Sequence, residues 1–335
     1  MLTKADDVRS PTRAARANLP FTTGNQTSIP LAAGSAAQEY VNAPWKNQRQ
    51  ALHAALHNHP LLAADELKFL ACGSDAWIER NTETGKYRVR AVGCKKRWCP
   101  RCAQIIRGRL RTQLRQWTTE TKLHKGESFR LITLTLRHTQ APLETQLRFL
   151  KAAYRRLRQQ RSWPRHVRQA AAIVQVNYNN ERDDWHPHLH VLALGTFFAH
   201  RELKNAWTKA SRGSAIVDIR LIKDPKKACD YVASYITRPD EWDLTTTPRS
   251  RIQEYILALR GQRLVILTGQ IPKLNLDELP ATNWERVSTL QTLLREARLG
   301  NEQARKILQE INFDVAEWLE NCPPPWETDN PESGP

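Results

Sequence analysis

The sequence predicts an α+β fold in which a central antiparallel β-sheet is flanked by helices. Stretches of β-branched and apolar residues are mixed with stretches of helical periodicity along the 335 residues, and no internal repeat is present. Two strand-like stretches, 169–179 and 185–194, are joined by the short polar turn "NERDD". Such a connection is typical of an antiparallel hairpin.

The remaining elements follow in order along the chain. Residues 1–38 are rich in Ser, Thr, Ala, Gly and Pro, which predicts a disordered tail. Apolar spacing predicts helix over 39–69, with a break at Pro60. Further helices are predicted at 103–117, 143–160, 200–211 and 225–236, and further strands at 129–138, 215–224 and 262–269. The remainder is predicted to be helical before a proline-rich end.

Charge is unevenly distributed along the chain. The formal net charge is +17, whereas residues 277–335 hold 12 acidic and 5 basic side chains. A basic body with an acidic end favours a polyanionic partner over a merely basic soluble protein. We see neither a secretory signal nor an apolar run of membrane length, so we expect a cytoplasmic protein without membrane contact. Its cysteines should then be reduced and available to metal.

Four cysteines lie close together with the spacing C-x21-C-x4-C-x2-C. They are Cys72, Cys94, Cys99 and Cys102. Four thiolates can surround one Zn²⁺ as a tetrahedron, and a closed site of this kind is structural. The alternative is four reduced cysteines without metal. Cys229 and Cys322 lie apart and are interpreted as ordinary thiols.

Basic side chains surround and follow the cysteines. Their density favours phosphate contacts over a merely solvated helix face. The residues that we predict to bind DNA are Lys95, Lys96, Arg97, Arg101, Arg107, Arg109, Arg111 and, further along, Arg238. The chain is accordingly divided into a disordered tail (1–38), a helical and zinc-binding DNA-contact module (39–120), a sheet domain (121–275) and a helical acidic extension with a disordered end (276–335).

The stretch "WHPHLHVLAL" places histidines at alternate positions of a predicted strand. His188 and His190 therefore project from one face and can hold one divalent cation, whereas Leu189 and Val191 face a core. A lone histidine here would more often be structural. A third ligand should come from the hairpin partner, on which Gln175 and Asn177 share a face, or from Glu181, Asp183 and Asp184 in the turn. We favour Gln175.

Tyr231 and Tyr235 lie four residues apart on a predicted helix, so their hydroxyl groups share one helix face. Paired tyrosines more often serve packing. In this basic, metal-binding context they can instead attack a phosphodiester, which forms a phosphotyrosine link and frees a 3′-OH. The ester conserves the bond energy, and the chain has no P-loop motif for ATP.

Three blocks in order, "FRLITLTLRH", "WHPHLHVLAL" and "ACDYVASYITRP", resemble the motifs of HUH endonucleases. With the upstream "CKKRWCPRC" and the late "LRGQRLVILTG", residues 72–270 most resemble rolling-circle plasmid replication initiators. The resemblance implies an HUH-type domain with a zinc module. It also implies that His188 and His190 are the metal pair, with His186 outside it.

The resemblance further implies that Tyr235 is the nucleophile. Tyr231 stands where the family has a glutamate, as in two-tyrosine members whose second hydroxyl makes a second strand transfer. Gln175 stands where the family has a glutamate on the neighbouring strand. Ser234 and Arg238 stand where lysines are frequent.

These implications predict an initiator that nicks single-stranded or hairpin origin DNA of a plasmid and leaves a 3′-OH primer. Mg²⁺ or Mn²⁺ would be catalytic and Zn²⁺ structural. Without a motor motif, the protein would need a host helicase and a host DNA polymerase; a homo-oligomer is left open. The alternatives are a two-tyrosine rolling-circle transposase and a non-catalytic zinc-containing DNA-binding protein.

Overall fold

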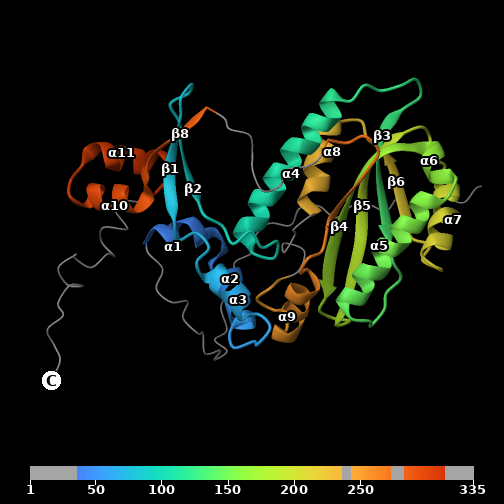
Figure 1. Ribbon diagram of the computed structural model, residues 1–335, viewed down its shortest axis with the longest axis horizontal. Helices are drawn as coiled ribbons and strands as arrows, with labels where there is room; N and C mark the ends of the chain where they lie inside the picture. Colours follow the sequence, from blue (N-terminus) through green and yellow to red (C-terminus); the bar gives the residue numbers. More distant parts are fainter. Residues whose placement is uncertain (1–35, 236–242, 273–282, 314–335) are drawn as a thin grey trace, which may run out of the picture.

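The computed structural model describes residues 36–235, 243–272 and 283–313. It confirms the α+β class, with a five-stranded sheet of order β6-β3-β5-β4-β7 and a three-stranded sheet of order β2-β1-β8 (Figure 1). The predicted tail lies almost wholly outside the described residues, as do Arg238 and Cys322.

All neighbouring strands of the large sheet are antiparallel. The strands are β3 (Ser128–Thr135), β4 (Val167–Asn179), β5 (Asp184–Gly195), β6 (Val217–Leu221) and β7 (Val265–Thr268). Each lies within a few residues of its prediction. The long hairpin of β4 and β5 forms the centre, because β5 pairs with β3 on its other side. The histidine stretch therefore occupies the middle of the sheet.

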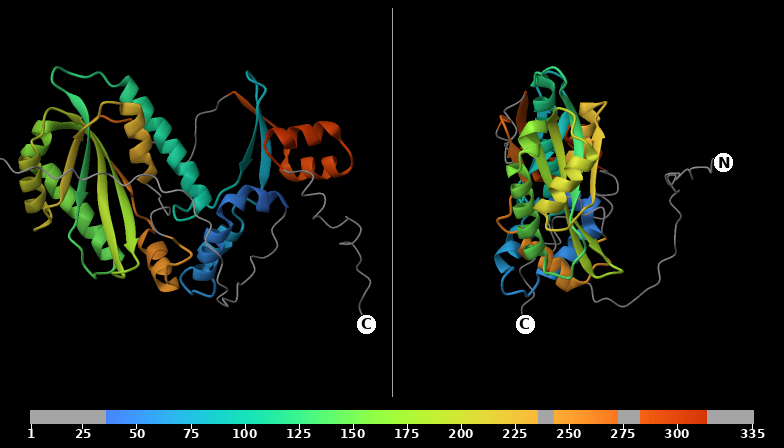
Figure 2. Two further views of the ribbon diagram at one scale, coloured as in Figure 1. Left: turned by 180° about the vertical axis from the view of Figure 1, so that it is seen from behind. Right: turned by 90° about the vertical axis from the view of Figure 1, so that its right-hand side faces the viewer.

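Helices cover both faces of this sheet (Figures 1 and 2). One face carries α5 (Leu143–Gln159), α6 (Ser162–His166) and α7 (His200–Ala210). The other carries α4 (Pro100–Glu120) and α8 (Pro225–Ser234), which pack against each other. Helix α5 buries Leu143, Leu147, Leu150, Tyr154 and Leu157, the 3.6-residue pattern that fixes its inner face.

A close backbone approach ends β5. A Cβ atom at Gly195 would lie 1.9 Å from the carbonyl oxygen of His166, so only glycine fits beside the start of β4. This contact keeps β4 and β5 in register, with Gln175 opposite His188.

The small sheet joins segments from opposite ends of the chain. Strand β1 (Ala76–Asn81) pairs with β2 (Tyr87–Ala91) and with β8 (Trp284–Thr289). Ile78 of β1 shares a core with α1 (Ala36–Asn42), α10 (Leu290–Arg298) and α11 (Glu302–Glu310). The sequence-based expectation of helix over 284–289 is therefore wrong, and the division at residues 120 and 276 separates segments that pack together.

The N-terminal helices connect the two sheets. After a 3-10 turn (Ala43–Trp45) come α2 (Lys46–Leu56) and α3 (Ala63–Leu70), and α2 packs against α9 (Arg249–Ala258). Between the strands of the large sheet and these helices runs one continuous core, to which Leu52, Phe69 and Trp98 contribute. No helix in the described part of the chain is long and apolar enough to span a bilayer.

Candidate metal centres and nucleic-acid interface

The four cysteines predicted from their spacing come together in the structure. The Sγ atom of Cys72 lies 3.8 Å from that of Cys99 and 3.6 Å from that of Cys102, and Cys94 Sγ lies 3.6 Å from Cys102 Sγ. A tetrahedron with metal–sulfur bonds of about 2.3 Å has edges of about 3.8 Å. The cluster can therefore hold one metal ion with four sulfur ligands.

Two buried guanidinium groups accompany this cluster. Arg49 lies 3.9 Å from Cys99 Sγ, and Arg101 lies 3.7 Å from Cys72 Sγ. Four thiolates around a divalent cation carry a net charge of −2, which the two arginines balance. Hydrogen bonds from neighbouring thiols, first that of Cys102, lower the pKa of Cys72.

The side chain of Arg101 is buried beside the cysteine cluster. Its guanidinium donates to the carbonyl oxygens of Ala91 and Val92 at 3.0 and 3.3 Å, and the residue is 7% exposed. These partners tie the Arg101 side chain to the cysteine module, and its contact with DNA stays a prediction. The charge of the residue alone gave no sign of this burial.

The histidines lie on β5 as the two-residue period predicts. His188 pairs with Gln175 across to β4 and with Thr135 across to β3, and His190 pairs with Thr133. Side chains of paired residues share one face of a sheet. Both histidines are buried, at 9% and 6% exposed.

His190 and Gln175 offer donor atoms to the same point. Nε2 of His190 lies 2.6 Å from Oε1 of Gln175, and Nδ1 of His190 lies 3.3 Å from the Thr133 hydroxyl. Nδ1 of His188 donates to the carbonyl oxygen of His186 at 3.1 Å, so in a neutral ring the lone pair is on Nε2. Two imidazoles and an amide oxygen fit a divalent cation.

The ring of His186 lies next to that of His188, with centroids 5.6 Å apart, but its nitrogen has another partner. Its Nε2 donates to the carbonyl oxygen of Leu136 at 3.3 Å, and its ring stacks on His138 at 4.3 Å. Burial, followed by the nearby His138, lowers the pKa of His186. The structure thus assigns His186 to contacts with the end of β3.

The other ligand candidates have different contacts. Asp183 pairs with Arg251 at 2.8 Å, which with Tyr178 lowers the pKa of Asp183 to about 2. Asp184 lies 3.1 Å from Nδ1 of His138. Asn177 lies opposite His186, and Glu181 is exposed in the turn. Gln175 is the candidate that contacts the histidine pair.

Both tyrosines lie beside the histidines. The ring of Tyr235 stacks on that of His190, with centroids 3.5 Å apart and planes at 8°, and Tyr231 meets Tyr235 edge-on at 4.7 Å. Tyr235 is 6% exposed and Tyr231 is 47% exposed. The structure therefore unites at one place the metal-donor and tyrosine motifs that the sequence keeps apart.

Helix α8 is fixed at its start and at its middle. The Asp224 side chain accepts hydrogen bonds from the backbone N–H groups of Lys226 and Lys227 and so caps the helix. Further along, Asp230 forms an ion pair with Arg115 of α4. These contacts set the position from which the tyrosines project.

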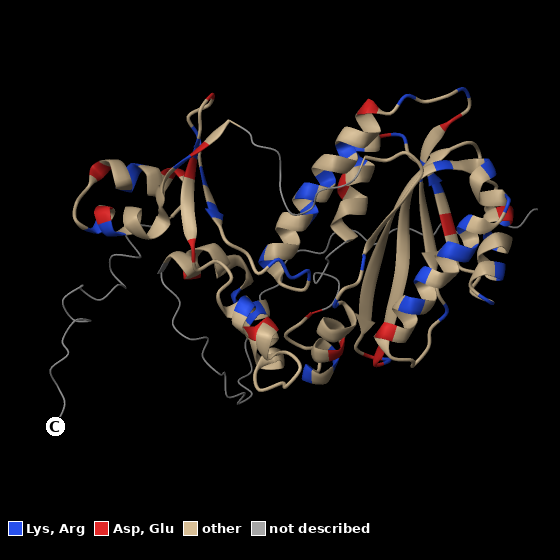
Figure 3. Ribbon diagram, viewed as in Figure 1, with Lys and Arg blue, Asp and Glu red and all other residues tan. Residues whose placement is uncertain are grey.

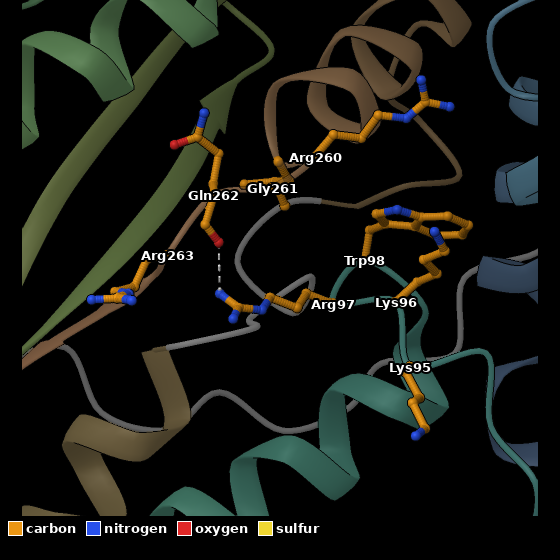
Figure 4. Close-up of a pocket in the computed structure, with 9 residues that line it drawn as sticks. Lys95, Lys96, Arg97, Trp98, Arg260, Gly261, Gln262 and Arg263 are labelled. Carbon is orange, nitrogen blue, oxygen red and sulfur yellow. Dashed lines mark hydrogen bonds between the residues drawn. The ribbon is translucent and has the colours of Figure 1, made fainter. Parts of the chain in front are cut away.

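The "CKKRWC" and "LRGQR" segments line one basic pocket of about 440 Å³ (Figure 4). Arg97 donates to the carbonyl oxygen of Gln262 at 3.2 Å and thereby joins the two segments. Lys96 and Arg260 both pair with the buried Asp65, which offsets part of their charge. The pocket is lined by Lys95, Lys96, Arg97, Trp98, Leu259, Arg260, Gly261, Gln262 and Arg263.

A second basic pocket adjoins the first through Gln262. It is lined by Arg148, Lys151, Ala152, Arg155, Arg158, Gln262 and Ile266. Burial, and then the charges of Arg97 and Arg263, lower the pKa of Lys151. Like charges brought this close favour an anionic ligand. The sequence analysis missed the arginines of α5 and Arg263, although "LRGQR" was singled out as a motif.

The remaining basic residues of the prediction lie along α4 (Figure 3). Arg111 is exposed, and Arg107 and Arg109 are half-buried. They extend the positive surface on the helix that packs against α8.

Comparison with known proteins identifies the family to which the chain belongs. A family model described as "Replication protein" matches residues 86–314. A protein named "Protein rep" from Bacillus sp is 28% identical over 50% of this chain and 58% of its own length. Another of the same name, from Bacillus amyloliquefaciens, is 28% identical over 45% of this chain and 48% of its own length. One from Staphylococcus aureus is 27% identical over 39% of this chain and 56% of its own length.

The matched region spans about half the length of these curated relatives. No solved structure matches the chain significantly. The family model, however, extends from β2 of the small sheet through the histidine strand and α8 to α11. This range is more than half of the chain. The resemblance seen in the motifs is confirmed, and the chain belongs to this family of replication proteins.

Proposed function

We propose that the protein initiates rolling-circle replication of a plasmid by nicking single-stranded or hairpin origin DNA. The observation that carries this proposal is that metal donors on β4 and β5 lie beside Tyr235 at the end of α8. Oε1 of Gln175 lies 2.6 Å from Nε2 of His190, and the Tyr235 ring stacks on the same imidazole. A metal-dependent tyrosine transesterification needs these groups in contact.

His188, His190 and Gln175 would hold Mg²⁺ or Mn²⁺. When bound, the cation supplies Lewis-acid polarisation of the scissile phosphate. The strand register would hold the three side chains together before any ligand arrives, because Gln175 lies opposite His188 and His190 is two residues further along the same strand.

Tyr235 would attack the phosphorus atom through its phenolic oxygen. A new P–O bond to the tyrosine forms while the P–O3′ bond breaks, and the 3′ oxygen receives a proton as the phenol loses one. The products are a 5′-phosphotyrosine link and a 3′-OH primer. Tyr231, which is 47% exposed and touches Tyr235, would make the second transfer.

The basic pockets would deliver the DNA strand to this site. The N–H of Val174 donates to the carbonyl oxygen of Leu264 at 2.8 Å, so the β4–β7 ladder continues toward Arg263. Arg263 therefore stands at the edge of the sheet near the level of Gln175. Phosphates held there lie two strands from the histidines.

The remaining roles follow from this chemistry. The four cysteines would bind structural Zn²⁺, which thiolate ligands favour. A host helicase would unwind the duplex and a host polymerase would extend the 3′-OH in the cytoplasm.

A covalent-adduct assay tests the proposal. Full-length protein is incubated with Mn²⁺ and single-stranded or hairpin DNA from the origin of its own element, and adducts are resolved on a denaturing protein gel. We expect an adduct that disappears in Tyr235→Phe and in the double variant Tyr231→Phe/Tyr235→Phe. Tyr231→Phe alone should keep the first adduct and lose strand rejoining.

Other outcomes would change the assignment. Loss of the adduct in Tyr231→Phe alone would make the exposed tyrosine the first nucleophile. No adduct with any DNA, from protein whose circular dichroism and origin binding are intact, would favour a non-catalytic DNA-binding protein.

A further inference from the structure

Two histidines and a glutamate form a second cluster outside the sites described so far. His53 and His57 lie one turn apart at the end of α2, and Glu66 lies in the first turn of α3. The i, i+4 spacing puts both imidazoles on one face of α2. The short connection between the helices brings the carboxylate against them.

The two imidazoles meet one oxygen atom of the carboxylate. Nε2 of His53 lies 3.2 Å and Nδ1 of His57 lies 3.0 Å from the same atom, Oε1 of Glu66. The donor atoms all lie within 4.8 Å of one another. A tetrahedral site with bonds of about 2.05 Å has edges of about 3.3 Å, which both contacts approach.

Burial and charge also favour a cation at this point. The side chains of His53 and Glu66 are 6% and 16% exposed, whereas that of His57 is 35% exposed and leaves an entry path. Among the residues that the structure describes, the charged partners of Glu66 are these two imidazoles. A half-buried carboxylate whose ion-pair partners are imidazoles gains from a bound cation.

Simple hydrogen bonding is the competing explanation. One carboxylate oxygen can accept from both imidazoles, which explains the two contacts to Oε1 without a metal ion. A metal ion is favoured because each of the three side chains offers a ligand atom within 4.8 Å of the other two, the spacing that ligation of one ion requires.

We propose that His53, His57 and Glu66 bind a zinc ion whose fourth position is open to water. Two imidazoles and a carboxylate suit Zn²⁺ better than Mg²⁺. The ion joins α2 to α3 at the place where α9 docks, since Gln253 donates to the carbonyl oxygen of Ala55 at 2.8 Å. Helix α2 thereby connects both zinc sites, because Arg49 contacts Cys99 one turn before His53.

Metal analysis of the full-length chain tests this proposal independently of nicking. The test uses a His188→Ala/His190→Ala background, which removes the cation site of the proposed nickase. After loading with Zn²⁺ and desalting, this protein should contain a second zinc per chain beyond that of the cysteine cluster. Glu66→Gln and His57→Ala should each lose that second zinc, whereas His59→Ala, in the same segment, should retain it. A cysteine variant, Cys94→Ser, should lose the other zinc.

Cobalt substitution separates the two sites. The Co²⁺ form of the wild type should show sulfur charge-transfer absorption from the cysteines together with visible bands from the nitrogen and oxygen ligands. In the His188→Ala/His190→Ala background, Glu66→Gln should leave only the sulfur absorption. A background chain with one zinc, or a second zinc retained in both Glu66→Gln and His57→Ala with circular dichroism unchanged, would overturn the proposal.

Discussion

Gln175 offers the histidine pair an amide oxygen in place of a carboxylate. An amide carries no charge, so it binds a hard cation more weakly than glutamate does. The side chain is 2% exposed and lies opposite His188 on the hairpin, which leaves its Oε1 directed at His190. Metal affinity is therefore the property that this residue should control.

Substitution of Gln175 should change the metal dependence of nicking. Gln175→Glu adds a negative charge, so we expect the Mg²⁺ concentration for half-maximal adduct formation to fall about tenfold. Gln175→Ala should raise it by a similar factor. Asn177→Asp, on the same strand but opposite His186, is the control and should change little. An unchanged Mg²⁺ dependence in Gln175→Glu would remove Gln175 from the ligand set.

At the scale of single residues, the sequence predicted the contacts that follow from the alternation of side chains along a strand. It missed those that depend on which residues become buried. Alternation placed His188 and His190 on one face, and hairpin pairing indicated Gln175. Thr133 was not foreseen, because the register of β3 against β5 cannot be read from either strand alone. The burial of Arg101 was not foreseen, because its charge does not show that it lies beneath the cysteines.

At the scale of elements, the ten residues of α8 lie between a capping aspartate, Asp224, and Tyr235 at the C-cap, and the helix itself carries Tyr231. Short helices depend strongly on their caps, because four N–H groups at the start lack helical partners. The sequence predicted this helix from Pro225 and its apolar spacing, but it gave no indication that α4 would pack against it.

Loss of the cap should loosen the tyrosines. Asp224→Ala should lower the free energy of unfolding by about 1 kcal/mol and slow adduct formation, whereas Asp224→Asn, which can still cap, should behave as the wild type. Urea unfolding and single-turnover adduct rates measure the two effects. A normal adduct rate in Asp224→Ala would show that α4 alone positions the helix.

A second prediction concerns the ion pair that ties the start of β3 to β4. Arg168 donates to both oxygens of Glu127, at 2.7 and 2.8 Å, and lowers the pKa of Glu127 to about 2. The pair therefore stabilises the fold above the unfolded value of about 4.3 and loses this contribution as pH falls toward 2.

Glu127→Gln should therefore destabilise the protein by on the order of 1 kcal/mol at pH 7, and less at each lower pH. Chemical unfolding at pH 3 to 7 measures the difference from wild type. Glu144→Gln removes an exposed pair with Arg148 and should have no measurable effect. A difference that does not shrink below pH 4 would assign the stability to packing instead.

At the scale of the whole molecule, the sequence predicted the class and the large sheet but not the small one. Strands β1, β2 and β8 are short and half-exposed, so their patterns are weak, and β8 finds its partners near the other end of the chain. Pairing between distant segments leaves no local signal. The basic pockets were not predicted for the same reason, because their linings combine "CKKRWC", α5 and "LRGQR", which lie far apart in the sequence.

The electrostatic role of these pockets predicts a change in salt dependence. Lys95→Gln combined with Arg263→Gln should weaken DNA binding and reduce the slope of log K against log salt by about 0.7 to 0.9 for each phosphate that the protein no longer neutralises. Fluorescence anisotropy across a salt series measures this slope. Lys306→Gln, exposed on α11 beside the small sheet, should leave it unchanged. An unaltered slope in the double variant would place the phosphates elsewhere.

The pairing of β1 with β8 also sets an order of events during synthesis. Thr82 and Asn283, which meet beside these strands, are separated by 201 residues. At about 5–20 residues per second, a ribosome needs roughly 10–40 s to make that span. During this interval β1 and β2 lack their third strand and helices α10 and α11, and the large sheet, whose last strand ends at Thr268, is made completely before β8. The small sheet, whose first strands are made early, is therefore among the last parts to fold, and a nascent chain that stops early leaves Ile78 exposed to quality control.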